Sequence, residues 1–203
     1  MNIGIVGIHT GIGKTVCSAV ICQALGFNYW KPVQAGDLDN SDSIFIKKNV
    51  NHPSCVIQRE RYKFLTAASP HYAAELENIV IRKEDFTLPN THNNLLVETA
   101  GGLMSPLSSG FLNIDLIEYL NLPVVLVSNN YLGSINHTLL SYTALKARKI
   151  KILGLVFVGE AVVPTERFIL EHTQLPLLFS IPFFKPLTPR AIEKFSKNVV
   201  IKF

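Results

Sequence analysis

The sequence predicts an α/β fold in which a doubly wound, mostly parallel sheet forms a single domain over residues 1–203. Short apolar runs rich in β-branched residues alternate with longer segments of helical period along most of the chain. The apolar runs are continuous, which is typical of strands that are covered by helices on both faces. No flexible or charged linker interrupts the chain, which supports one domain.

The expected elements follow in a regular order. The first half should contain a strand, a helix, a strand and a helix, at residues 3–8, 14–25, 29–33 and 41–48. The second half should contain strands at 94–98, 123–128, 151–158 and 176–181, with helices near 112–120, 135–148, 165–173 and 189–197. Residues 50–93 show weak periodicity and many polar and proline residues, so we expect irregular structure there with at most one helix, starting after Pro70.

Composition restricts the class of protein. Hydrophobic residues make up 48% of the chain and charged residues 17%, which suits a well-buried core and excludes a disordered chain. The longest apolar runs are too short to span a bilayer, and residues 2–8 resemble a strand rather than an export signal. The three cysteines form no CxxC pair, and the net charge of +4 indicates only a mild affinity for anions. We therefore expect a cytoplasmic protein without a zinc–thiolate site.

The stretch GIHTGIGKT, residues 7–15, has the features of a phosphate-binding loop. Gly13, Lys14 and Thr15 follow the first expected strand and open the first helix. Backbone amides there can cradle phosphate oxygens, Lys14 can neutralise them, and the Thr15 hydroxyl can bind Mg²⁺. The usual pattern GxxxxGK(S/T) needs glycine at position 8, where this chain has Ile8. A glycine-rich helix N-terminus with a surface lysine is the alternative, but the strand-to-helix context favours a P-loop NTPase fold.

Three more charged residues are expected at the same edge of the sheet, where parallel strands end. Lys31 ends the second strand and could join Lys14 around a polyphosphate, although a lysine at a strand end can also extend into solvent. Asp42 opens a helix and Glu98 ends a strand. Carboxylates in such places suit Mg²⁺ bound to phosphates, and for Asp42 the alternative is an interaction with the helix dipole.

A second anion site is expected at the start of the helix near residues 135–148. The backbone amides of Gly133, Ser134, Ile135 and Asn136 would lie at this helix N-terminus, which suits a carboxylate. Ser134 or Asn136 could instead serve only as a helix cap.

Taken together, these segments resemble the dethiobiotin synthetases, and the resemblance spans most of the chain. GIHTGIGKT is similar to that family's GTDTxVGKT, in which the first glycine also stands one place early. KPVQAG resembles KPVxxG, and NSD resembles the acidic motif that follows it. SPH, VETAGG and LGSINH resemble a short signature, VEGAGG and LGxINH of the family.

The resemblance implies ATP- and Mg²⁺-dependent carboxylation of 7,8-diaminononanoate with CO₂ or bicarbonate, which yields dethiobiotin, ADP and phosphate. One amine would form a carbamate, the carbamate oxygen would attack the γ-phosphate to give a carbamic-phosphoric anhydride, and the second amine would close the ring. The resemblance also implies a homodimer with the substrate site at its interface, and no nucleic acid or membrane as partner.

The resemblance assigns a role to each matching residue. Lys14 and Lys31 would hold the carbamate and the γ-phosphate together, and Thr10 would lie against the reacting groups. The Mg²⁺ ligands would be Thr15, Asp42 and Glu98. Nucleotide contacts would come from Gly11, Ile12, Gly13, Lys14, Thr15, Val16, Glu98 and Val158. Substrate contacts would come from Lys31, Ala35, Gly101, Gly133, Ser134, Ile135 and Asn136.

Four residues depart from the family's pattern. Ala35 stands where the family has a Ser or Thr hydroxyl near the substrate, and Thr99 replaces the first glycine of VEGAGG. Gly11 replaces a commonly acidic loop residue. Val158 stands where an asparagine would read the adenine edge, so another NTP could serve in place of ATP.

Two other functions compete with this interpretation. A partitioning or septum-positioning ATPase has a related P-loop architecture and acts as a nucleotide-switched dimer on DNA or membrane. Such proteins carry a second lysine early in the loop, where this chain has His9. A catalytically inactive relative would account for Ala35, Thr99 and Val158, but the chain keeps both lysines and both carboxylates.

Overall fold

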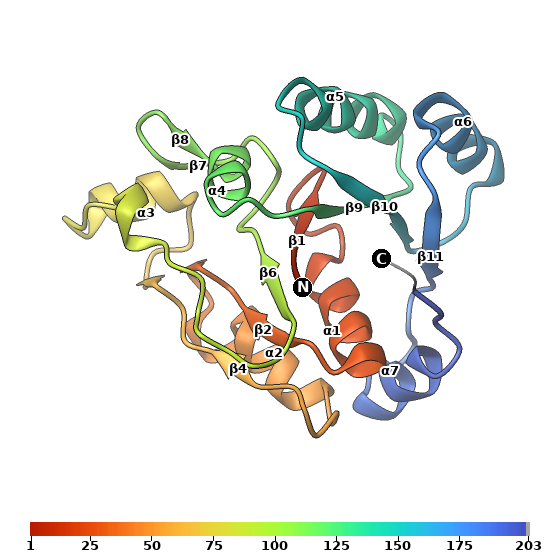
Figure 1. Ribbon diagram of the computed structural model, residues 1–203, viewed down its shortest axis with the longest axis horizontal. Coiled ribbons are helices and arrows are strands. Elements are labelled where there is room, and N and C mark those ends of the chain that lie inside the picture. The colour runs from red at the N-terminus through yellow and green to blue at the C-terminus, as the bar shows by residue number, and fades with distance from the viewer. Residues whose placement is uncertain (202–203) are drawn as a thin grey trace.

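The computed structural model describes residues 1–201 and is built around a seven-stranded sheet between two layers of helices (Figure 1). The last two residues of the expected domain lie outside this range. All neighbouring strands of the sheet are parallel, in the order β11-β10-β9-β1-β6-β2-β4. The strands are β1 (Asn2–Gly7), β2 (Asn28–Trp30), β4 (Ile57–Gln58), β6 (Leu95–Glu98), β9 (Val124–Asn129), β10 (Ile152–Val158) and β11 (Leu177–Ile181). The predicted doubly wound fold is thus confirmed.

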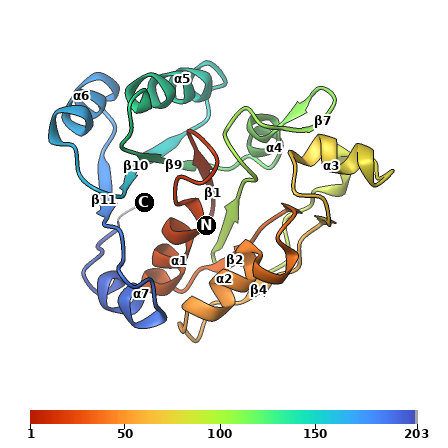
Figure 2. The same cartoon turned by 180° about the vertical axis from the view of Figure 1, so that it is seen from behind.

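Helices cover both faces of this sheet. One face carries α1 (Lys14–Leu25), α2 (Asp42–Asn49) and α7 (Pro189–Ser196), and α1 packs against both of the others. The opposite face carries α4 (Asn113–Tyr119), α5 (Ser134–Ala147) and α6 (Val163–Thr173), a separation that is also clear from behind (Figure 2). The continuous apolar strands are buried as expected, since Ile3, Ile5 and Val6 of β1 have no exposed surface. Each predicted helix and strand is present with its ends shifted by a few residues at most.

The central strand β1 sets the position of the phosphate-binding loop. On one side β1 pairs with β6, and on the other with β9, to which the chain crosses after β6 and α4. Ile5 is in register with Glu98, so the ends of β1 and β6 lie side by side. A ligand held by the loop after β1 therefore lies close to the carboxylate that ends β6.

Residues 50–93 contain more regular structure than we expected from the sequence. The helix near Pro70 is present as α3 (Pro70–Leu76), with η2 (Lys83–Asp85) after it and β4 and β5 (Tyr62–Phe64) before it. The strand expected at 29–33 ends at Trp30, and the chain resumes beyond Pro32 as β3 (Val33–Ala35), which pairs with β5. These strands have two or three residues and depend on distant partners, so no local period indicates them.

Smaller elements complete the chain. They are η1 (Leu38–Asn40), which precedes α2, and the antiparallel pair β7 (Pro106–Ser108) and β8 (Phe111–Leu112). α3 lies beside β7 and β3, at the end of the molecule away from α6 (Figure 1). Within residues 1–201, no helix combines the length and the apolar character that crossing a membrane requires.

Candidate active site

The loop between β1 and α1 has the backbone geometry of a phosphate-binding loop. Gly13 precedes α1 in the left-handed region, with φ of 93°, and no side chain caps this helix start. A Cβ atom at Gly13 would lie 2.6 Å from Cγ1 of Val158, so space as well as φ requires glycine here. The first amides of α1 are thus left without a protein acceptor from a side-chain cap, which suits a bound anion.

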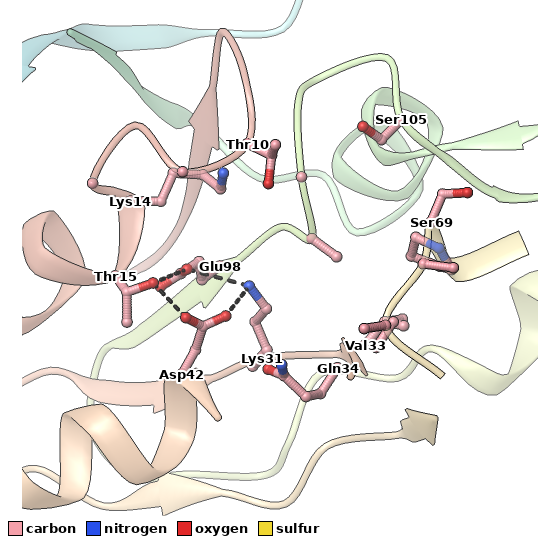
Figure 3. A pocket seen from close by; sticks show the side chains of 18 residues that line it. Thr10, Lys14, Thr15, Lys31, Val33, Gln34, Asp42, Ser69, Glu98 and Ser105 are labelled. Carbon is pink, nitrogen blue, oxygen red and sulfur yellow. Dashed lines mark hydrogen bonds and ion pairs between the residues drawn. The ribbon is translucent and has the colours of Figure 1, made fainter. Parts of the chain in front are cut away.

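A cavity of about 540 Å³ lies at the carboxyl edge of the sheet, beside this loop (Figure 3). Its lining comes from the phosphate-binding loop and from segments after β2, before α3 and after β6. The predicted site residues that it brings together are Thr10, Gly11, Gly13, Lys14, Thr15, Lys31, Ala35, Asp42, Glu98 and Gly101. Residues as far apart in the sequence as Thr10 and Gly101 therefore share one cavity because several strands end there.

Lys31 is held inside a charged cluster. Its side chain is 5% exposed, and its Nζ lies 2.6 Å from Oδ2 of Asp42 and 3.2 Å from Oε1 of Glu98. Burial lowers the pKa of Lys31, but the two carboxylates outweigh burial and the net shift is upward. Burial would raise the pKa of Asp42, but Lys31 overcomes this and lowers it. Lys31 and Asp42 therefore remain charged in the folded protein.

The Thr15 hydroxyl lies between the same two carboxylates. Its Oγ1 is 2.6 Å from Oδ1 of Asp42 and 2.9 Å from Oε1 of Glu98, so three oxygens from α1, α2 and β6 converge. These are hard oxygen ligands of the kind that Mg²⁺ prefers. Across the described residues, no group of three or more His, Cys, Asp or Glu side chains could hold a metal ion. The residues that could hold Mg²⁺, together with phosphate oxygens and water, are Thr15, Asp42 and Glu98.

Lys14 enters the same cavity without an acidic partner. Its Nζ donates to the backbone oxygen of His9 at 3.2 Å, and no carboxylate within residues 1–201 forms an ion pair with it. Burial and the nearby positive charge of Lys31 lower the pKa of Lys14 from 10.5 to about 8. Lys31 thus affects the protonation of Lys14, which is the one of the two lysines without a carboxylate ion-pair partner within residues 1–201.

Comparison with known proteins identifies the family. A family model described as an AAA domain matches residues 1–191. The ATP-dependent dethiobiotin synthetase BioD of Christiangramia forsetii is 43% identical to this chain, with 96% of each sequence covered. The protein of the same name from Bradyrhizobium diazoefficiens is 44% identical, covering 97% of this chain and 94% of its own length.

The chain belongs to the dethiobiotin synthetase family. This confirms the resemblance found in the sequence motifs and the predicted class of enzyme, an ATP-dependent ligase.

Solved structures confirm the P-loop NTPase fold. The septum site-determining protein MinD of Pyrococcus horikoshii, complexed with Mg-ADP, has a TM-score of 0.61 at 16% identity and covers 98% of this chain and 96% of its own. A ParA family ATPase from Chlorobium tepidum has a TM-score of 0.59 at 14% identity, with coverage of 97% and 98%. At such identities the likeness shows the fold alone, and the partitioning-type alternative is not favoured over the synthetase family.

The departures from the family's pattern are accommodated without strain. Thr99 is buried, and its hydroxyl donates to the backbone oxygen of Ile5 at 3.1 Å. Ala35 lines the cavity with a methyl group where the family has a hydroxyl. Gly11 has open space around it. Val158 is buried against Gly13 and does not line the cavity.

Several predicted residues lie outside this cavity. Ile12 and Val16 flank Gly13 to Thr15 without lining it, and their nucleotide contacts remain predictions. The lining also lacks the segment expected to bind a carboxylate, Gly133, Ser134, Ile135 and Asn136. That segment starts α5, and His137 from its first turn lines a second cavity of about 500 Å³, which shares Thr10 and Ser105 with the first.

One wall of the cavity was not predicted. It is formed by small and apolar residues together with three polar ones, namely Val33, Gln34, Ala67, Ala68, Ser69, Pro70, Ala100 and Ser105. Gly36 lets this wall form, because a Cβ there would lie 2.5 Å from the Cα of Ala67. The motifs KPVQAG, SPH and VETAGG contain Val33 and Gln34, Ser69 and Pro70, and Ala100, respectively, but gave no indication that these residues form one wall. The wall depends on the pairing of β3 with β5, which local patterns do not indicate.

Proposed function

We propose that this chain carboxylates 7,8-diaminononanoate with CO₂ and closes the ring to dethiobiotin, at the expense of ATP. The observation that carries the proposal is the convergence of two lysines, two carboxylates and a P-loop threonine in one cavity of a dethiobiotin synthetase family member. The volume of about 540 Å³ suits a small substrate together with a terminal phosphate.

The loop after β1 binds the triphosphate in this proposal. Backbone N–H groups at the start of α1 donate to phosphate oxygens, and Lys14 gains an anionic partner from the triphosphate. Mg²⁺, when bound by Thr15, Asp42 and Glu98, offsets negative charge on the phosphates. Lys14 and Thr15 are adjacent in sequence but act on different atoms, since Lys14 points into the cavity while Thr15 faces the carboxylates (Figure 3).

Lys31 holds the group that receives the phosphoryl. One substrate amine adds to CO₂ and loses a proton, giving a carbamate whose oxygen attacks the γ-phosphate as ADP leaves. The second amine then attacks the carbonyl carbon of the anhydride and expels phosphate. Lys31 and Lys14 keep the carbamate and the γ-phosphate in contact and offset their charge, while Thr10 lies against the reacting groups. The wall of Val33, Ala35 and Pro70 suits an aliphatic chain.

A second copy of the chain would complete the substrate site. The carboxylate end of the substrate needs an anion-binding group, and the segment 133–136 lies outside the cavity of its own chain. Large apolar side chains are exposed around that segment, namely Leu132, Leu140 and Met104. A homodimer that buries them would place the amides of one copy beside the cavity of the other.

Phosphate release tests the proposal. The protein is incubated with ATP, Mg²⁺, bicarbonate and the diamine, and free phosphate and dethiobiotin are measured together. Phosphate release that requires the diamine and matches dethiobiotin formation is the expected result. Release that ignores the diamine and is stimulated by DNA or lipid would overturn the proposal in favour of a partitioning-type ATPase.

A further inference from the structure

Tyr29 lies beneath the charged cluster and outside the cavity. It is fully buried in β2, and its hydroxyl donates to Oε2 of Glu98 at 3.0 Å. Tyr29 is in register with Leu96 of β6, so Glu98 is two residues further along on the same face of that strand. A tyrosine ring is long enough to reach such a diagonal neighbour. The contact thus follows from the pairing of β2 with β6.

The two oxygens of Glu98 face different partners. Oε1 is 2.9 Å from the Thr15 hydroxyl and 3.2 Å from Nζ of Lys31. Oε2 accepts from Tyr29 and from Ser18, whose Oγ is 2.7 Å away. Both oxygens thus accept from protein donors, but the donors to Oε1 line the cavity whereas the donors to Oε2 lie outside it.

Tyr29 is the donor that has no other acceptor. Ser18 has a single proton, and its Oγ also lies 3.0 Å from the backbone oxygen of Lys14, so the two acceptors compete. The Tyr29 hydroxyl has Glu98 as its only partner in the part of the chain that the structure describes. Without Tyr29, Oε2 would keep only the shared proton of Ser18, so the broad terminal torsion of the carboxylate would be less restricted on that side.

We propose that Tyr29 is a positioning residue that orients the Glu98 carboxylate, with Oε1 directed to the metal position beside Thr15. This inference rests on the Mg²⁺ site proposed above. Tyr29 acts through Glu98 alone, because it does not line the cavity. Hydrogen-bond partners that orient a metal ligand in this way commonly change metal affinity by about 10–100-fold when they are removed.

The test is Tyr29→Phe, which removes the hydroxyl and keeps the ring. The affinity for ADP is measured by calorimetry, once with Mg²⁺ and once with EDTA, and the ratio gives the gain due to the metal. We expect affinity in EDTA to change by less than about twofold, because no phosphate contact is lost, and the gain due to Mg²⁺ to fall by about tenfold or more. An unchanged gain in Tyr29→Phe overturns the role of Tyr29.

Two controls separate orientation from a general effect on folding. Tyr119→Phe removes a hydroxyl from a partly exposed tyrosine at the end of α4 and should leave both affinities unchanged. In a Glu98→Gln background the metal ligand is already impaired. Adding Tyr29→Phe to this variant should therefore not reduce the Mg²⁺-dependent increase in ADP affinity any further. A full further loss in that background would overturn the proposal, because Tyr29 would then act independently of Glu98.

The wild-type arm distinguishes this inference from the proposed function. If the unaltered protein binds ADP equally well with Mg²⁺ and with EDTA, the assigned metal site fails, and the inference about Tyr29 falls with it. If the unaltered protein shows the gain and Tyr29→Phe keeps it, only the inference about Tyr29 fails. Thermal unfolding of each variant verifies that it is folded at the temperature of the binding measurement.

Discussion

The two strand ends that carry Lys14 and Lys31, the lysines to which we assign the catalytic role, are built in opposite ways. After β2, Lys31 is inserted between the carboxylates of Asp42 and Glu98, and its net pKa shift is upward. After β1, the Nζ of Lys14 donates to a backbone oxygen and forms no ion pair within residues 1–201, and burial beside Lys31 lowers the pKa of Lys14 to about 8. The charge of Lys31 is thus compensated by two carboxylates of the protein, whereas the charge of Lys14 would be compensated by a bound anion.

The difference in charge compensation between Lys31 and Lys14 has consequences for the stability of the free protein. A buried ion pair is costly to break from one side, because the partner charge stays behind without compensation. A buried cation without a partner instead opposes folding, since the unfolded chain hydrates it better. Lys31 should therefore contribute to stability before any substrate binds, and Lys14 should lower stability until an anion binds. In the proposed reaction both lysines offset charge on the reacting groups, whereas in the free protein their charges have opposite effects on stability.

The largest expected effect is on the stability of the ligand-free protein. Lys31→Met leaves Asp42 and Glu98 without their cation and should lower the free energy of unfolding by about 3–5 kcal/mol. Lys14→Met removes an uncompensated charge and keeps an apolar stem, so it should raise the free energy of unfolding at pH 7 by roughly 2 kcal/mol. Urea denaturation without nucleotide measures both. Equal shifts in the same direction would contradict the contrast.

The second effect is on catalysis, where Lys31→Met and Lys14→Met should act in the same direction although their effects on stability are opposite. Each of these two variants should lower kcat/KM by at least about 100-fold, the size typical of losing one group that stabilises developing charge. Initial rates of diamine-dependent phosphate release measure this. Near-normal turnover by Lys31→Met, once it is folded, would show that its charge serves the fold alone. Arg61, an exposed cation paired with Asp85, offers the matched control, and Arg61→Met should retain activity.

The sequence predicted the charged side of the site well because simple topology determines it. Strand ends of a parallel sheet meet at one edge, so residues just after β1, β2 and β6 had to gather there. The different states of Lys14 and Lys31 were not predictable, since both look like a lysine at a strand end. Their difference depends on the register of Ile5 with Glu98 and on the start of α2 at Asp42. These are tertiary relations that no local pattern encodes.

The apolar wall of the cavity also could not be predicted from local sequence patterns. Ala67 and Ala68 belong to a segment with weak periodicity, and small side chains carry little information about what they face. Their place follows from β3 and β5, short strands outside the main sheet. Sequence reasoning therefore placed the charged side chains at one edge of the sheet, but it did not predict the wall that would hold an aliphatic substrate in the proposed function.

The third prediction concerns the pH dependence of ADP affinity, which should reflect the lowered pKa of Lys14 and not the raised pKa of Lys31. Lys14 titrates at about 8 in the free protein, below its ordinary value of 10.5, so above about pH 8 it must take up a proton when an anion binds. ADP affinity in EDTA should therefore fall by up to about tenfold per pH unit above pH 8. Lys31, with its raised pKa, adds no change in this range. Calorimetry should show this fall in the wild type and lose it in Lys14→Met.

The smallest expected effect lies at the base rather than the phosphates. In the proposed function both lysines contact parts that all nucleoside triphosphates share. Val158, which stands where the family resemblance implies an asparagine that reads adenine, offers no hydrogen-bonding side-chain group and packs on Gly13. Without a paired polar group, discrimination between bases is weak, so kcat/KM for ATP should exceed that for GTP or CTP by less than about tenfold. Parallel rate measurements with the three nucleotides test this. A preference above about 1000-fold would mean that other residues read the base, and that nucleotide choice does not depend on the phosphate end alone.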